Sequence, residues 1–171
     1  MLFRSCYEKA LEIDPRDAYA WYNKGNSLDS LGRYDEAIRC YEKALEIDPR
    51  SARTWNGKGA SLYSLGQHAE AIRCLEKALE IDPRYAVAWN NKGLSLNSLG
   101  RYDEAIRCYE KALEIDPRDA AAWYNKALAE ESLGRREAGV KSYRHFIACA
   151  PPQYAAQVAK ARQRLAELEG R

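Results

Sequence analysis

Residues 18–51 read AYAWYNKGNSLDSLGRYDEAIRCYEKALEIDPRS, and closely related stretches follow at intervals of 34 residues, the length of this stretch. Tryptophan, proline and the glycine of a Leu-Gly pair all keep that interval. The periodic positions are Trp21, Trp55, Trp89 and Trp123; Pro15, Pro49, Pro83, Pro117 and Pro151; and Gly32, Gly66, Gly100 and Gly134. A fixed period kept by three residue types indicates an array of repeated structural units.

Each unit is predicted to contain two helices. In the first unit, Trp21, Gly25 and Leu28 recur at helical spacing, and Gly32 follows, as glycine often does at a helix end. Helical periodicity resumes after Gly32 and stops at Pro49, because proline lacks the amide proton and disfavours a helical residue before it. No segment shows the strict alternation of a strand, so the chain is predicted to be all-α.

Glycines inside the predicted first helices indicate close packing. Gly25, Gly59 and Gly93 each cost about 1 kcal/mol relative to alanine in a helix, which is reasonable where another helix crosses closely. Alanines such as Ala37 are the matching small residues on the second helices. One helix pair cannot bury its own apolar face, so neighbouring pairs are predicted to stack into a solenoid with the first helices on its concave side.

The period divides the chain into a half repeat, four repeats and a C-terminal segment. The half repeat is residues 1–17, the repeats are residues 18–51, 52–85, 86–119 and 120–153, and residues 154–171 follow. The fourth repeat is degenerate, since Ala127 replaces the glycine and Gly139 and Phe146 replace two alanines. Terminal repeats are often atypical because one side faces solvent, and the last segment is predicted to be a capping helix.

These residues resemble the tetratricopeptide repeat family. In the first unit the family's pattern is met by Trp21, Gly25, Ala37, Tyr41 and Pro49, and the second and third units match at the same offsets, with leucine in place of the tyrosine in the second. The resemblance covers the whole chain and is close to the family consensus. It implies a right-handed α-solenoid of stacked helix–turn–helix repeats that serves as a protein–protein interaction scaffold.

Residues 1–17 correspond to a second helix without a first helix before it. Its apolar face would normally pack on that missing helix. We expect either that the chain is a fragment of a longer array, which we favour, or that another copy of the chain supplies the contact. Self-association through this N-terminal helix therefore remains an alternative.

Composition narrows the range of partners. The net charge is +2, from 27 basic and 25 acidic residues, and no concentrated basic face of the kind that binds nucleic acid or membrane surfaces is expected. No apolar run approaches the length of about 20 residues that a membrane-spanning helix needs, and no signal-peptide core follows Met1. A cytoplasmic location is the default expectation.

Cysteine and histidine give little sign of catalysis or metal binding. Cys6, Cys40, Cys74 and Cys108 share one repeat position, where neighbours on stacked helix pairs lie about 8–10 Å apart, too far for a disulfide. Such thiols fit a reducing compartment. His68 and His145 have no serine, cysteine or aspartate at a spacing that suggests a nucleophile and base. We therefore expect no enzymatic activity, no metal and no cofactor.

The inner face of the first helices is the predicted binding site. Asparagine amides offer both a donor and an acceptor, so a row of them can hold the main chain of an extended peptide, and tyrosines add rigid contact area. The predicted groove residues are Tyr22, Asn23, Asn26, Arg53, Asn56, Tyr63, Asn90, Asn91, Asn97, Tyr124 and Asn125. Asn23, Asn91 and Asn125 resemble an asparagine ladder known in the family, interrupted at Gly57; the alternative is that they are only consensus residues.

A second mode known in the family is a cationic clamp for the carboxylates of chaperone tails. Aligned on the first three repeats, its positions hold Tyr22, Asn26, Gly57, Val87 and Asn91; on the last three they hold Asn56, Ala60, Asn91, Ala121 and Asn125. Neither set contains a cation, so a receptor of that type is not expected. The leading hypothesis is a scaffold that binds an unidentified protein or peptide in the groove, and the alternative is a structural spacer or self-association module within a longer protein.

Overall fold

The computed structural model describes residues 2–170, with side chains from Cys6 onward. Residues 1 and 171, the ends of the predicted terminal segments, lie outside the described residues. The described residues form ten α-helices, one short 3₁₀ helix and no strand, which confirms the all-α prediction. The elements are α1 (Leu2–Ile13), α2 (Ala18–Ser30), α3 (Tyr34–Ile47), α4 (Ala52–Ser64), α5 (His68–Ile81), α6 (Ala86–Ser98), α7 (Tyr102–Ile115), α8 (Ala120–Ser132), α9 (Arg136–Cys149), η1 (Pro152–Tyr154) and α10 (Ala155–Glu169).

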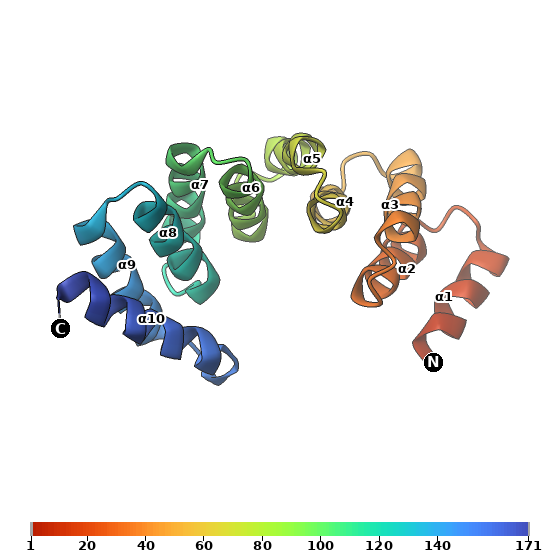
Figure 1. Cartoon of the computed structure of the whole chain (residues 1–171). Coiled ribbons are helices and arrows are strands. Elements are labelled where there is room, and N and C mark those ends of the chain that lie inside the picture. The colour runs from red at the N-terminus through yellow and green to blue at the C-terminus, as the bar shows by residue number, and fades with distance from the viewer. Residues whose placement is uncertain (1, 171) are drawn as a thin grey trace. The chain divides into compact units, whose positions relative to one another are not determined.

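Two compact units make up the chain, Met1–Asn91 and Lys92–Arg171. The boundary falls within α6. In the first unit α2 packs on α1 and α3, α4 packs on α3 and α5, and α2 also touches α4 (Figure 1). In the second unit α8 packs on α7 and α9, and α10 packs on α9. Helix–turn–helix pairs thus stack through their neighbours, as a solenoid of repeats requires.

Local interactions set both ends of the first helices, and the glycine end is the one that the sequence predicts. The Asp17 side chain caps α2 by accepting the Ala20 N–H at 3.0 Å, and aspartate or serine does the same at α4 and α8. At the other end, Gly32 has a φ of 72°, a left-handed conformation that glycine adopts without strain. The Arg33 N–H then bonds the Leu28 carbonyl at 2.9 Å, which satisfies a carbonyl left open by the end of the helix.

The periodic tryptophan and proline are joined by a hydrogen bond. The Trp21 indole Nε1–H donates to the Pro15 carbonyl at 2.9 Å, across the turn that enters α2. Trp55 and Pro49 repeat this bond at 2.9 Å. The same pairing occurs in the other two repeats. The two residue types keep a common period because each tryptophan holds the turn that precedes its own helix.

The expected close approach at the mid-helix glycines is confirmed. A Cβ built on Gly25 would lie 2.6 Å from the Tyr41 ring, and one on Gly59 would lie 2.8 Å from Leu75. The alanine at the matching second-helix position, Ala37, is fully buried. These small residues let the two helices of a repeat pack backbone close to backbone.

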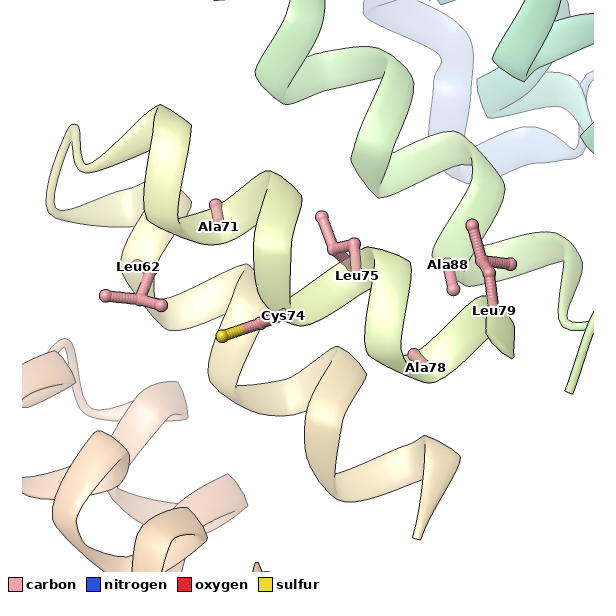
Figure 2. Close-up of a cluster of buried hydrophobic side chains, with 7 residues drawn as sticks. All are labelled: Leu62, Ala71, Cys74, Leu75, Ala78, Leu79 and Ala88. Carbon is pink, nitrogen blue, oxygen red and sulfur yellow. The ribbon is translucent and has the colours of Figure 1, made fainter. Parts of the chain in front are cut away.

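A cluster of buried apolar side chains lies between α4 and α5 and extends to the start of α6 (Figure 2). Its buried members are Leu62, Ala71, Cys74, Leu75, Ala78, Leu79 and Ala88. No disulfide joins the five cysteines, all of which lie in the described part of the chain. Cys40, Cys74 and Cys108 are buried whereas Cys6, at the same repeat position on α1, is exposed. Burial raises the pKa of the Cys40 and Cys74 thiols.

Candidate functional site

The first helices of the first unit place most of the predicted groove residues together. Tyr22 and Asn26 lie one turn apart on α2, and Arg53 and Asn56 lie one turn apart on the neighbouring α4. We call the surface formed by Tyr22, Asn23, Asn26, Arg53 and Asn56, with Asn91 from α6, the α2–α4 surface. Its members are half-buried, apart from the exposed Arg53.

Asn26 belongs to a polar network beneath the α2–α4 surface. The Tyr41 hydroxyl donates to Asn26 Oδ1 at 2.8 Å, and the Ser61 hydroxyl on α4 donates to Asp29 Oδ1 on α2. Burial, and then the nearby Asp29 carboxylate, raise the pKa of Tyr41. The phenol therefore stays protonated and holds Asn26 as its acceptor, so this asparagine has a structural role as well as a place on the surface.

Two of the predicted groove residues bond to each other. Asn91 Nδ2 donates to Asn56 Oδ1 at 3.0 Å, which links α6 to α4. At the interruption of the ladder, a Cβ on Gly57 would lie 2.9 Å from the Tyr41 ring.

Several polar groups of the α2–α4 surface have no hydrogen bond to any described residue. They are the Asn23 amide, the Asn56 N–H₂ group, the Tyr22 hydroxyl and the Arg53 guanidinium. None of these atoms is enclosed. They are therefore donors and acceptors that a ligand could reach.

A hollow of about 310 Å³ opens beside them, between the start of α2 and the start of α4. Its lining is Ala18, Tyr19, Tyr22, Asp48, Ser51, Arg53 and Thr54. Tyr19 is 71% exposed, with its ring 6.5 Å from that of Tyr22. Tyr85 lies close by: burial raises the pKa of its phenol, Tyr22 adds to the rise, and the Arg53 charge opposes it.

Sequence reasoning missed Tyr19 and Tyr85 as members of this site. One signal was present, because Tyr85 stands at the repeat position that holds a helix-capping Asp17, Ser51 or Asp119 in the other units. A large ring at a capping position indicates a role other than capping.

The second unit has a hollow of its own, about 440 Å³ in volume, between α8 and α10. It is lined by Tyr124, Leu128, Glu131, Ser132, Tyr143, Lys160, Ala161, Gln163 and Arg164. Of the predicted groove residues only Tyr124 lies here, where its ring packs 4.9 Å from that of Phe146. The sequence prediction did not include the α10 residues because this helix follows the last predicted repeat, which ends at residue 153.

The remaining predicted residues are scattered. Asn90 is only 9% exposed, so the expectation that it faces a ligand is wrong, whereas Tyr22, Asn56 and Tyr124 at the equivalent positions are half-buried. Tyr63 packs against His68, with ring centroids 5.2 Å apart. Asn97 and Asn125 belong to the second unit and are half-buried, and the Asn97 Oδ1 atom has no hydrogen-bond partner among the described residues.

Within residues 2–170, no group of three or more histidine, cysteine or acidic side chains is arranged to hold a metal ion. No helix in this part of the chain is both long and apolar enough to cross a membrane.

Three family models, each described as tetratricopeptide repeat, match residues 18–51, 50–118 and 96–166. Together they extend over all four repeats and into α10. The chain belongs to the tetratricopeptide repeat family. Comparison with curated proteins gives no match.

Solved structures of other tetratricopeptide repeat arrays resemble this chain. MamA is 28% identical, with a TM-score of 0.77 and 85% of each chain covered. PilW, a type IV pilus biogenesis factor, is 25% identical, with a TM-score of 0.87 over 97% of this chain and 76% of its own. The first tetratricopeptide domain of Spaghetti (RPAP3), bound to the HSP90 peptide SRMEEVD, is 27% identical with a TM-score of 0.68, covering 71% of this chain and 96% of that one.

Tetratricopeptide repeat domains generally mediate protein–protein interaction. Members of the family, like these structural relatives, are typically scaffolds rather than enzymes.

Proposed function

We propose that this tetratricopeptide repeat protein is an interaction scaffold that binds an extended peptide segment of its partner along the α2–α4 surface. One observation carries the proposal: the Asn23 amide, the Asn56 N–H₂ group, the Tyr22 hydroxyl and the Arg53 guanidinium lie on neighbouring helices without a hydrogen bond to the described residues. An extended peptide exposes unpaired backbone N–H and C=O groups, which need such partners when they leave water.

The spacing of the helices suits a short segment. Packed helices lie about 8–10 Å apart, and an extended chain advances about 3.3 Å per residue. A peptide that crosses from α2 over α4 to the start of α6 would therefore use about six residues. Main-chain recognition by amides supplies affinity that depends little on the peptide's side chains.

The hollow between the starts of α2 and α4 would take one side chain of the peptide. Tyr19 and Tyr22 line it and Tyr85 lies close by, and tyrosine rings provide large contact areas at a low cost in conformational entropy. Arg53 adds a cation at its rim. One solved relative binds the peptide SRMEEVD, but we do not propose the same ligand for this chain. The positions of the cationic clamp hold no lysine or arginine here; they are Tyr22, Asn26, Gly57, Val87 and Asn91.

A random twelve-residue peptide display library, selected on the intact chain, tests the proposal. The selected peptides are then measured by fluorescence anisotropy against the triple variant Asn23→Ala, Arg53→Ala and Asn56→Ala. We expect the triple variant to bind at least tenfold more weakly, because it removes the side chains that would contact the peptide.

A matched triple variant on the second helices, Arg39→Ala, Lys43→Ala and Arg73→Ala, removes side chains outside the α2–α4 surface and is expected to bind normally. Circular dichroism checks that both variants keep their helix content. Equal affinities for the two triple variants would show that the peptides bind elsewhere, and the proposal would be wrong.

Self-association through α1 is the second candidate function. Cys6 on α1 is exposed, whereas the equivalent Cys40, Cys74 and Cys108 are buried. The face of α1 that carries Cys6 is therefore open to a further helix. Sedimentation velocity over a wide concentration range tests this candidate, and a monomer at the highest concentration would eliminate it.

A further inference from the structure

The hollow between α8 and α10 combines an apolar floor with a charged rim. Leu128 is 37% exposed and lies beside the Tyr124 ring. The ring of Tyr143 is fully buried, and its hydroxyl donates to Glu131 Oε2 at 2.8 Å. The volume of about 440 Å³ lies within the usual range for ligand sites, roughly 300–1,000 Å³.

The charges at the rim are unequal. Glu131 is already paired, since it accepts from Tyr143 and forms an ion pair with Arg164 of α10. Arg164 also pairs with Glu167. Lys160, one turn before Arg164, is exposed and has no carboxylate partner among the described residues. The site therefore offers a ligand an uncompensated positive charge above an apolar floor.

The corresponding place in the first repeat differs in both respects. Asp29 occupies the repeat position of Glu131, but its partner on the next first helix is the neutral Ser61 rather than an arginine. Asn26 occupies the position of Leu128. Lysines also occupy the position of Lys160 in all four repeats, but Lys58 and Lys126 there pair with Glu42 and Glu110. What distinguishes this hollow from the first repeat is therefore a lysine without a carboxylate partner beside an exposed leucine.

We propose that this hollow is a second binding site, independent of the α2–α4 surface, for an acidic peptide segment that carries one large apolar side chain. The apolar side chain lies against Leu128 and Tyr124, where burial of its surface is favourable. A neighbouring carboxylate of the peptide pairs with Lys160. An acidic segment fits because its carboxylate meets an unpaired cation, whereas a basic segment would bring a like charge to Lys160.

The probe is a pool of fluorescein-labelled nonapeptides with leucine at the centre and a random mixture of aspartate, glutamate, glycine and serine around it. A second pool replaces the acids with lysine and arginine, and a third replaces the central leucine with serine. Fluorescence anisotropy on the intact chain should show at least tenfold tighter binding of the acidic leucine pool than of either other pool. The binding should weaken with added salt, because exposed charges are screened.

Two charge reversals on α10 provide a matched pair. Lys160→Glu should weaken binding of the acidic pool at least fivefold. Arg162 is also exposed and lies on the same helix but does not line the hollow, so Arg162→Glu should change the binding less than twofold. The Asn23, Arg53 and Asn56 triple variant should bind the acidic pool normally.

Equal binding of the acidic and basic pools, or equal losses in the two α10 variants, would overturn this proposal. Loss of binding in the triple variant would place the acidic pool on the α2–α4 surface; the second site would then be wrong while the proposed function stands.

Discussion

The ring of Tyr41 occupies the space that a side chain at Gly25 would need: a Cβ there would lie 2.6 Å from Cε1. The same ring lies against Gly57 of the next repeat, where a Cβ would be 2.9 Å from Cζ. One aromatic side chain of α3 therefore packs against the backbones of both α2 and α4, and its hydroxyl reaches Asn26 on the α2–α4 surface. Packing between repeats and the position of a surface residue depend on the same ring.

Replacing Gly25 with alanine should destabilise the protein. Overfilling a packed site costs about 1–3 kcal/mol, and alanine regains about 1 kcal/mol of helix propensity, so a net loss of up to about 2 kcal/mol is expected. Urea unfolding followed by circular dichroism measures it. Gly139→Ala is the control, since its Cβ would meet nothing closer than 3.6 Å and should stabilise α9 slightly. An unchanged midpoint in Gly25→Ala would mean that the ring moves aside freely.

Lys126→Met should destabilise the protein more than Lys58→Met. Both lysines are mostly buried, and each pairs with a half-exposed glutamate of the preceding helix. Lys126 pairs with Glu110, and Lys58 pairs with Glu42. Lys126 also lies 3.5 Å from Glu130, whose side chain is 6% exposed and accepts a hydrogen bond from Ser142. Removing Lys126 leaves this buried carboxylate without its cation, an effect worth about 2 kcal/mol or more.

Denaturant midpoints of the two lysine variants give the comparison directly. The substitution Glu130→Gln gives a further check. In that background, Lys126→Met and Lys58→Met should lower the stability by nearly equal amounts. If the two lysine variants lost equal stability in the wild-type background, Glu130 would not depend on Lys126.

Alkaline pH should lower stability through Tyr143. Burial raises the pKa of its phenol to about 12, above the value of about 10 expected in the unfolded chain. Because the folded state holds the proton more tightly, this contribution to stability is complete below about pH 10 and is lost as the pH rises towards 12. Urea midpoints measured across this range should fall less steeply in Tyr143→Phe than in the wild type. Tyr41 acts in the same direction, so some slope should remain in the variant.

The repeat period was sufficient to predict the helices and their ends, because each end has a local cause. Gly32 needs a positive φ and Asp17 caps its own helix, and both facts depend only on nearby residues. The close approach at Gly25 was predictable for a similar reason, since a helical glycine has few other uses. Properties that repeat with the sequence were therefore predictable from it.

The candidate sites were only partly predictable, because they depend on contacts between repeats and on residues outside the period. Periodicity placed Asn56 and Asn91 on the same face but could not show that one would use its amide to bond the other. The burial of Asn90 likewise depends on packing rather than on helix position. The hollow at Leu128 depends on where α10 lies after η1, and the position of α10 could not be read from the four repeats before it.

The different burial of the cysteines has a practical consequence for how this array loses its structure. Cys6, Cys40, Cys74 and Cys108 are chemically identical probes, one on each of four successive second helices, and only the first is exposed in the folded chain. In an array whose stability is a sum of nearest-neighbour terms, unfolding proceeds by fraying of whole repeats. The order in which an alkylating reagent modifies these thiols as urea is raised would record the direction of that fraying, without any added label.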